Sequence, residues 1–354
     1  MVETSSKPVV TITGISGFIG MYVVRDFLQD GGFTVRGTVR GKTEEKVAPI
    51  KEAMGELYEQ LEIVEADLLN PESLADAIAG STFVVHTASP FPLKNPKNAD
   101  ELIKPAVEGT LAVMKACHKH GVKRLVITSS CAAIMDQRPE NRKPIYNCDD
   151  WSDLEYQMTT NVYSRSKTMA ERAAWNFIKE LPEAEKFELV TICPSFVVGR
   201  ALHYKAFTSG EIVTKMFTGE FPVMKIKFPF VRVEDVAMSH LRAIKVPEAA
   251  NNRFVLNKET KWMSEVSGSM AAEFNPQGFN VKHGNTSYAL VWVISIFMKE
   301  LNSILSSWDF EFEIEHKKTV DILGIEFKNP EEGVNQMIYD LLDHKLIPDK
   351  RKKK

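Results

Sequence analysis

The sequence contains few cysteines and no excess of positive charge. None of its 4 cysteines lies in a C-x-x-C pair or beside a histidine pair of the zinc-site type, so we expect free thiols in a reducing compartment and no metal site. Its 44 basic residues are outnumbered by 47 acidic ones. The resulting net charge of −3 argues against a general binder of nucleic acid or of anionic membranes.

Long apolar runs are lacking as well. The longest, Tyr288–Met298, would extend about 16 Å as a helix, whereas a membrane span needs about 30 Å. We interpret it as a buried or partner-facing helix, with a monotopic membrane contact as the alternative. No signal peptide opens the sequence, because Met1–Ser6 is polar and Val9–Thr13 is too short. We therefore expect a cytoplasmic protein without a transmembrane span.

Strand-like and helical segments alternate over residues 1–199. Strand-like runs such as Val9–Thr13, Thr34–Val39 and Leu61–Glu65 alternate with helical stretches such as Glu44–Gln60 and Thr159–Leu181, and this pattern predicts βαβ units with a parallel sheet. Near-continuous apolar strands indicate that helices cover both faces of the sheet. We therefore predict an α/β fold, a Rossmann-type doubly wound parallel sheet with a smaller C-terminal substrate lobe.

We divide the chain where this alternation changes. The predicted units are a nucleotide-binding Rossmann domain (1–199, with 229–257 returning to its sheet), a substrate-binding lobe (200–228 and 258–345) and a basic disordered tail (346–354). Within the returning segment, Phe230–Ala237 and Arg253–Leu256 are expected as strands. For the tail, a dibasic retrieval signal is the alternative interpretation.

A glycine-rich turn joins the first strand to the first helix with the spacing G-x-x-G-x-x-G. Glycine allows a tight turn with positive φ and a close approach of pyrophosphate to backbone amides, and the helix N-terminus offers N–H groups to phosphates. The strand–turn–helix context predicts dinucleotide binding, and a turn that serves packing alone is the alternative. The expected contacts are Gly14, Ser16, Gly17, Phe18, Ile19 and Gly20.

The residues after the second strand indicate which dinucleotide is bound. An acidic residue about 20 positions after the glycine loop would bind the ribose 2′-hydroxyl of NAD, but no carboxylate lies between Phe33 and Lys42. Arg40 lies there instead, and a guanidinium can hold a 2′-phosphate through two hydrogen bonds. We therefore expect NADP(H), with Arg40 as the 2′-phosphate contact. A solvated basic turn is the alternative.

A Y-x-x-x-K pattern, formed by Tyr163 and Lys167, lies on a predicted helix. Residues i and i+4 share one helix face, so Lys167 is expected to stabilise the phenolate of Tyr163 and to lower its pKa from about 10. Thr128, Ser129 and Ser130 end the fifth strand, at the edge where doubly wound sheets place their sites. An exposed tyrosine and lysine without a catalytic role are the alternative.

These motifs together resemble the extended branch of the short-chain dehydrogenase/reductase superfamily. TGISGFIG, VRGTVR, VVHTASP, RLVITSS, YSRSK, CPSFVVG and FVRVEDVA follow one another as in the dihydroflavonol reductase, cinnamoyl-CoA reductase and yeast-type ketoreductase group. The resemblance implies a triad of Ser130, Tyr163 and Lys167, with Ser129 as the alternative serine. It implies that NADPH delivers hydride to a bound ketone or aldehyde, while Ser130 holds the carbonyl oxygen and Tyr163 donates the proton.

The same resemblance assigns further contacts. Lys167 and Tyr163 would also contact the nicotinamide ribose. Other cofactor contacts would be Asp67 and Leu68 on the adenine side, Ala88 on the phosphate side and Pro194 beside the nicotinamide. On the substrate side, the resemblance implies Pro90, Met135 and Phe196. The partner expected from these assignments is a small-molecule carbonyl compound.

Two positions depart from the family pattern. Met135 falls where plant flavonoid reductases usually carry Asn or Asp, and because a thioether cannot hydrogen-bond in that way we do not expect a flavonoid substrate. Arg200 replaces the usual proline after Gly199 and would either meet an acidic group of the substrate or lie on the surface.

Three other functions stay open at this point. A nucleotide-sugar epimerase or dehydratase would normally carry an acidic residue where Arg40 lies. A 3β-hydroxysteroid dehydrogenase-like enzyme is encouraged only by the apolar run near residue 290. A cofactor-binding sensor would typically lack the tyrosine or the lysine. The natural substrate, the direction of the reaction and the oligomeric state are not readable from the sequence.

Overall fold

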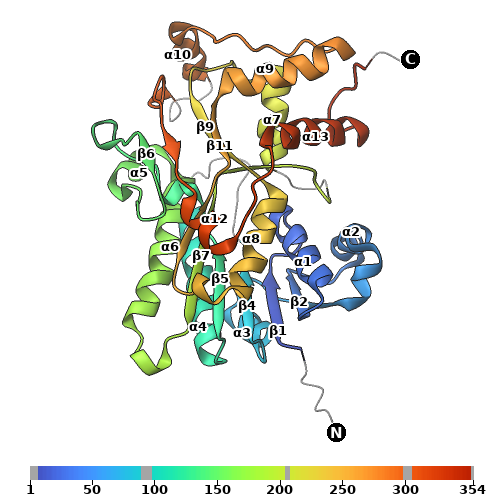
Figure 1. Cartoon of the computed structure of the whole chain (residues 1–354), viewed down its shortest axis with the longest axis vertical. Helices are drawn as coiled ribbons and strands as arrows, with labels where there is room; N and C mark the ends of the chain where they lie inside the picture. The colour runs from blue at the N-terminus through green and yellow to red at the C-terminus, as the bar shows by residue number, and fades with distance from the viewer. Residues whose placement is uncertain (1–6, 89–97, 204–207, 298–304, 352–354) are drawn as a thin grey trace.

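A seven-stranded sheet forms the centre of the molecule. The computed structural model describes residues 7–88, 98–203, 208–297 and 305–351. The strand order is β10-β7-β5-β4-β1-β2-β3, and every neighbouring pair is parallel (Figure 1). The strands are β1 (Val9–Thr13), β2 (Thr34–Val39), β3 (Leu61–Glu65), β4 (Phe83–His86), β5 (Arg124–Thr128), β7 (Glu188–Pro194) and β10 (Arg253–Leu256). The predicted doubly wound α/β fold is confirmed.

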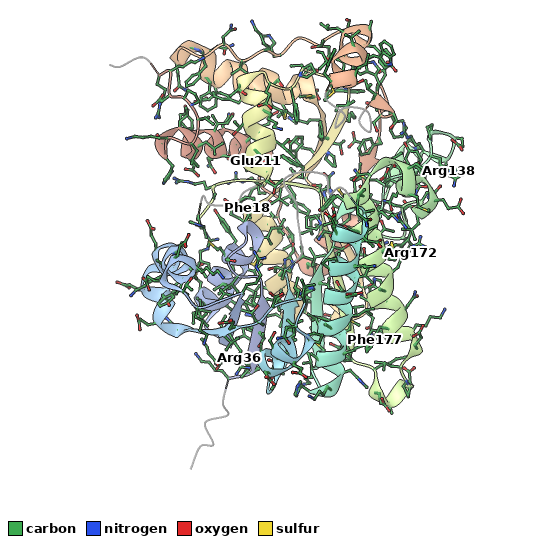
Figure 2. The ribbon with its side chains drawn as sticks, turned by 180° about the vertical axis from the view of Figure 1, so that it is seen from behind. Phe18, Arg36, Arg138, Arg172, Phe177 and Glu211 are labelled. Atoms are coloured by element: carbon green, nitrogen blue, oxygen red, sulfur yellow. The ribbon has the colours of Figure 1, made fainter. Side chains whose placement is uncertain are left out.

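Helices cover both faces of this sheet, as the continuous apolar strands require. Buried side chains of one cluster join the sheet to helices on one face: α1 (Phe18–Asp30), α2 (Glu44–Met54), α8 (Val233–Lys245) and α12 (Lys317–Leu323). A second cluster joins it to helices on the other face, which Figure 2 shows in front: α3 (Pro71–Ile78), α4 (Asp100–Lys119) and α6 (Val162–Glu180). The strand order reverses between β1 and β4, so their carboxyl ends border a crevice suited to a ligand.

A smaller lobe lies beyond the carboxyl ends of the strands (Figure 1). It has its own apolar cluster and a three-stranded sheet of β11 (Glu259–Trp262), β9 (Lys227–Arg232) and β8 (Phe196–Val198). Its helices are α7 (Thr208–Thr218), α9 (Met263–Phe274), α10 (Tyr288–Phe297) and α13 (Pro330–Asp343). The side of the lobe near α6 carries α5 (Leu154–Thr160) and a two-stranded ribbon of β6 (Ile145–Tyr146) and β12 (Glu313–Ile314).

The structure differs from the expected elements between residues 227 and 245. Phe230–Ala237 was expected as one strand of the central sheet, but β9 ends at Arg232 and pairs with β8 and β11 in the lobe. From Val233 the chain forms α8, whose buried side chains recur at helical spacing. The apolar stretch therefore divides between two elements. Arg253–Leu256 does join the central sheet, beside β7.

Two expected helices are shorter than their composition indicates. The helix expected over Thr159–Leu181 is two helices, because the Asn161 side chain accepts a hydrogen bond from the Ser164 N–H and starts α6 with a new N-cap. The helix expected over Glu44–Gln60 ends at Met54, and a 3₁₀ turn continues to Gln60. Within the described residues, no helix is both long and apolar enough to cross a membrane.

Candidate active site

The glycine loop packs so tightly that side chains are excluded from it. Gly14 has φ of +74°, and a Cβ there would lie 2.7 Å from the Ala88 Cα atom. A Cβ on Gly20 would lie 2.3 Å from the Gly14 carbonyl oxygen. Both positions therefore require glycine, and the loop brings the start of α1 against the end of β4, with Ser16 and Gly17 exposed at its tip.

This arrangement fits the pyrophosphate of a dinucleotide. Gly17 is the N-cap of α1 and has no side chain to accept from the first turn, whose N–H groups lack intrahelical acceptors. Phe18 and Ile19 begin the helix, and Phe18 packs against the apolar clusters of both the sheet and the lobe (Figure 2). Thr87 Oγ1 donates to the Thr13 carbonyl at 2.6 Å, which holds the loop after β4 against the glycine loop.

The residues expected at the adenine end follow β2 and β3. Arg40 is exposed, and no hydrogen bond or ion pair joins it to another described residue. Arg36 of β2 is not available for the cofactor, since it binds Glu62 at 3.0 Å and two backbone carbonyls. Asp67 Oδ1 accepts from the Leu69 N–H at 2.9 Å, and Leu68 packs over Gly109 of α4. Arg40 is thus an accessible cation at this edge, and the exposed Lys42 and Lys46 follow it in the sequence.

Ser130, Tyr163 and Lys167 come together at the carboxyl end of β5. Ser130 is the N-cap of a short 3₁₀ turn, and its hydroxyl makes a hydrogen bond with Tyr163. Lys167 is buried one turn further along α6, and its Nζ donates to the Thr128 carbonyl at 3.5 Å. Ser129, the alternative serine, points elsewhere, because its hydroxyl donates to Glu171 Oε2 at 2.6 Å.

Burial governs the protonation of these groups. It raises the pKa of the Tyr163 hydroxyl well above its usual value, although the hydrogen bond with Ser130 opposes the rise. Lys167 was expected to lower this pKa, but in the structure the loss of hydration on burial has the larger effect and raises it. Burial also lowers the pKa of Lys167 to about 8, although Cys193 and Glu171 oppose this. The site thus holds a protonated phenol beside a lysine that titrates near neutral pH.

A buried ion pair that the sequence analysis missed lies beneath the site. Glu171 Oε1 accepts from Arg253 Nε at 2.7 Å, and both side chains are buried. Glu171 also accepts from Ser129 and from Thr191 Oγ1, the latter at 2.8 Å. The Arg253 guanidinium lies 3.8 Å from the ring centre of Trp151. The available signal was a glutamate on the buried face of the helix, four residues after Lys167.

The expected nicotinamide and substrate residues lie on neighbouring strands. Pro194 ends β7 opposite Leu256 of β10, and the ring of Phe196 in β8 packs edge-on against Phe230. Between them, the buried Ser195 hydroxyl has no hydrogen-bond partner among the described residues. Met135 is half-buried in the apolar cluster that contains Cys131. Pro90 falls outside the described residues.

The structure also shows the contacts of other polar side chains, including Arg200, whose role the sequence left open. His86 and His240 are buried and make hydrogen bonds with Thr13 and Thr128, each at 2.7 Å. Arg200 binds Asp340 of α13 at 2.8 Å while most of its side chain stays exposed, so the structure agrees with the expected surface position. All four cysteines are free and buried. Within the described residues, no group of acidic, histidine and cysteine side chains could hold a metal ion.

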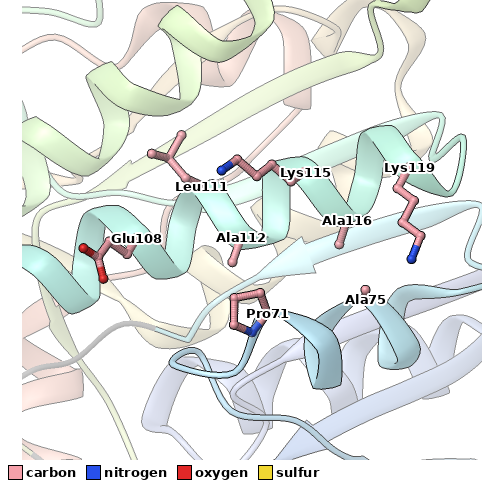
Figure 3. A pocket seen from close by; sticks show the side chains of 8 residues that line it. All are labelled: Pro71, Ala75, Glu108, Leu111, Ala112, Lys115, Ala116 and Lys119. Atoms are coloured by element: carbon pink, nitrogen blue, oxygen red, sulfur yellow. The ribbon is translucent and has the colours of Figure 1, made fainter.

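A separate hollow of about 380 Å³ lies between α3 and α4, on the outer side of the sheet. Figure 3 shows Ala112 and Ala116 of α4 facing Pro71 and Ala75 of α3. The space remains because the alanine side chains that face each other are small. None of the predicted site residues lines it. We attribute it to loose helix packing.

Comparison with known proteins agrees with this geometry. Residues 10–257 match the family described as the NAD dependent epimerase/dehydratase family. The chain is 32% identical over 275 residues to a bifunctional dihydroflavonol 4-reductase/flavanone 4-reductase of Pyrus communis, covering 74% of this chain and 75% of the relative. It is 33% identical to tetraketide alpha-pyrone reductase 1 of Arabidopsis thaliana, over 76% of this chain and 82% of that relative. The solved structure of Gre2 from Candida albicans in complex with NADPH is 26% identical with a TM-score of 0.77, covering 95% of this chain and 99% of that one.

Proposed function

Because the chain belongs to the NAD dependent epimerase/dehydratase family, we propose that it is an NADPH-dependent reductase that converts a ketone or aldehyde to an alcohol. The observation that carries this proposal is that Ser130, Tyr163 and Lys167 come together at the carboxyl end of β5, where Lys167 is buried one helical turn from Tyr163 and its Nζ lies 3.5 Å from the Thr128 carbonyl oxygen. The printed names of the relatives, which are reductases, support the reaction class.

The residues that would hold the cofactor surround the crevice between β1 and β4. The glycine loop and the first turn of α1 would bind the pyrophosphate, with Ala88 on its other side. Arg40 would bind the 2′-phosphate, since it has no competing contact among the described residues. Asp67 and Leu68 would lie on the adenine side and Pro194 on the nicotinamide side. When bound, NADPH supplies the hydride.

The chain itself supplies the proton and holds the carbonyl oxygen. Ser130 donates a hydrogen bond to that oxygen and so favours the negative charge that develops there. Tyr163 then donates its proton to the alkoxide, which is a stronger base than a phenolate. The raised pKa of Tyr163 keeps this proton in place at neutral pH. Protonated Lys167 stabilises the phenolate that remains, and its ammonium group would also hold the ribose.

The half-buried Met135, Phe196 and the unpartnered hydroxyl of Ser195 would border the substrate. This lining is apolar with one polar group, which favours a carbonyl compound of low charge over a phosphorylated or strongly acidic one. Arg200 pairs with Asp340, so we do not count it among the substrate contacts.

The test is absorbance at the reduced-nicotinamide band with purified protein, first with NADPH and then with NADH. Substrates would be α-ketoaldehydes, aliphatic diketones, aromatic aldehydes and dihydroflavonols. We expect carbonyl-dependent NADPH oxidation that falls about 10³-fold or more in Tyr163→Phe. Cofactor binding without oxidation would contradict the proposal and favour an epimerase or a sensor. Preference for NADH would contradict the role of Arg40.

A further inference from the structure

Helix α10 exposes apolar side chains on most of its surface. Only Val291 and Ser295 of its 10 residues are buried, and Val291 and Ile294 attach the helix to the apolar cluster of the lobe. Of the two expected interpretations, a buried helix or a partner-facing one, the structure therefore contradicts the buried one. Its large apolar side chains with exposed fractions between 46% and 83% are Tyr288, Leu290, Trp292, Val293, Ile296 and Phe297. Such a surface is unfavourable in water and indicates a binding partner.

The shape of this surface is a ridge rather than a broad patch. A helix of 10 residues is about 15 Å long, and the other helices of the lobe, α7, α9 and α13, add no exposed large apolar side chain among the described residues. A stable interface between two proteins takes about 20–30 residues from each side. The ridge is therefore too small for a stable dimer by itself, whereas it suits insertion between lipid headgroups.

The segment that leads into α10 carries positive charge. Residues 274–297, which end with this helix, contain one lysine and one histidine but no Asp or Glu, and the nearest glutamates in the sequence are Glu273 and Glu300. Lys282 and His283 are exposed just before the helix. The nearby Asp309 follows Trp308, whose ring lies 5.2 Å from that of Tyr288, and Lys225 neutralises it at 2.6 Å. The exposed Lys282 thus complements an anionic surface, although the net charge of the whole chain does not.

A second basic segment leads from the same lobe. The sequence ends in Lys350-Arg351-Lys352-Lys353-Lys354, although Arg351 is paired with Asp343 and Asp349. Helix α13, which precedes this segment, and α10 both lie at the end of the molecule away from the N-terminus (Figure 1). Basic residues near an anionic membrane add electrostatic attraction to the burial of apolar side chains.

We propose that α10 inserts its exposed apolar side chains into the headgroup region of a membrane containing anionic phospholipids. The basic C-terminal segment strengthens this attachment. Tyr288 and Trp292 favour that depth, because amphipathic aromatic rings concentrate at the membrane–water interface. The chain lies on the membrane without crossing it, and the nucleotide-binding domain stays in water. This attachment is independent of the proposed reaction.

The test uses the full chain and sedimentation with vesicles of phosphatidylcholine, alone or mixed with phosphatidylserine. We expect binding to the mixed vesicles that is about tenfold tighter than to the neutral ones and that weakens with salt. A double variant, Leu290→Asn with Phe297→Asn, should lose at least about tenfold in affinity, because it removes two large apolar side chains from the surface that would be buried. Deleting residues 350–354 should weaken binding to the mixed vesicles only.

The matched control is Val320→Asn, which replaces an exposed apolar side chain on α12 and should bind vesicles as the unmodified chain does. Thermal unfolding monitored by circular dichroism checks that each variant folds. Absence of vesicle binding by the full chain, or equal binding by the double variant, would overturn the proposal. So would a concentration-dependent dimer in sedimentation velocity that the double variant abolishes, since a second copy would then cover α10.

Discussion

The carboxyl end of the central sheet buries charged side chains, whereas helix α10 exposes apolar ones. Beneath Tyr163, the ionisable side chains of Lys167, Glu171 and Arg253 are buried. On α10, apolar side chains face solvent instead. Both arrangements cost free energy in the isolated chain. The buried charges are compensated by hydrogen bonds and by opposite charges within the protein. The exposed apolar side chains would be compensated by an external surface that covers them. Departures from ordinary burial thus mark the two regions of interest.

The largest expected effect tests whether the buried charges depend on one another. Glu171→Ala leaves Arg253 buried without its partner and should lower the free energy of unfolding by about 3–5 kcal/mol. The matched control is Glu62→Ala, which removes an exposed partner of Arg36 and should cost about 0–1 kcal/mol. Urea unfolding measures both. Equal losses would show that burial does not distinguish the two pairs.

Acid should destabilise the same region through its histidines. Burial lowers the pKa of His86 to about 3 and of His240 to about 4, whereas both have a pKa near 6.5 when unfolded. The unfolded chain then binds more protons below pH 6.5, so stability is complete above that pH and falls as the pH decreases. Each histidine should remove about 2 kcal/mol between pH 7 and pH 5.

Urea unfolding at the two pH values measures this dependence. His240→Asn should reduce the pH-dependent loss by about 2 kcal/mol, whatever it does to stability at neutral pH. His283→Asn, at an exposed position beside α10, should leave the loss unchanged. A loss that persists in full in His240→Asn would assign it to other groups.

The two adjacent serines should separate catalysis from stability. Ser130→Ala should lower kcat/KM about 10²–10³-fold, because it removes a donor to the carbonyl oxygen. Ser129→Ala should leave kcat/KM nearly unchanged and lower the free energy of unfolding by about 1–3 kcal/mol, since Glu171 loses a hydrogen bond. Steady-state kinetics and urea unfolding of both variants provide the readout. The reverse pattern would make Ser129 the catalytic serine.

The pH profile of reduction should report on Lys167. Its ammonium form is the active one, and with a pKa of about 8 it loses its proton as the pH rises, so kcat/KM should decrease above about pH 8. Lys167→Arg should be less active overall but should not show this decrease up to about pH 10, because arginine stays protonated. A decrease at the same pH in the variant would assign it to another group.

The smallest effect concerns an exposed charge. Arg40→Ser should reduce the preference for NADPH over NADH about tenfold, because the 2′-phosphate loses a charged partner in a well-hydrated setting. Arg40→Lys keeps the charge but lacks the bidentate geometry, and its preference should fall between the two. Competition between the cofactors in the absorbance assay measures the ratio. An unchanged preference in Arg40→Ser would place 2′-phosphate recognition elsewhere.

Features that depend on local sequence could be predicted closely. The strands Val9–Thr13, Thr34–Val39 and Leu61–Glu65 have the predicted bounds, because each is a short apolar or β-rich run between turn residues. The start of α1 and the turn before it follow from glycine spacing. Helical and strand periodicities express which face of an element meets the core, and neighbouring residues carry that information.

Contacts between distant residues could not be predicted in this way. Glu171 and Arg253 are 82 residues apart, and nothing in either local sequence specifies their pairing. The choice between Ser129 and Ser130 depended on which hydroxyl turns toward Tyr163. The 233–245 segment became a helix because its buried face packs on the sheet, whereas β9 left the sheet for the lobe.

The amino-acid sequence by itself determined the parallel α/β architecture, the dinucleotide loop and the helical spacing of Tyr163 and Lys167. Only the tertiary structure decided the buried Glu171–Arg253 pair, the raised pKa of Tyr163 and the exposure of α10. The reason is physical: backbone geometry and periodic burial act over a few residues, whereas hydration and charge pairing depend on everything that packs around a group.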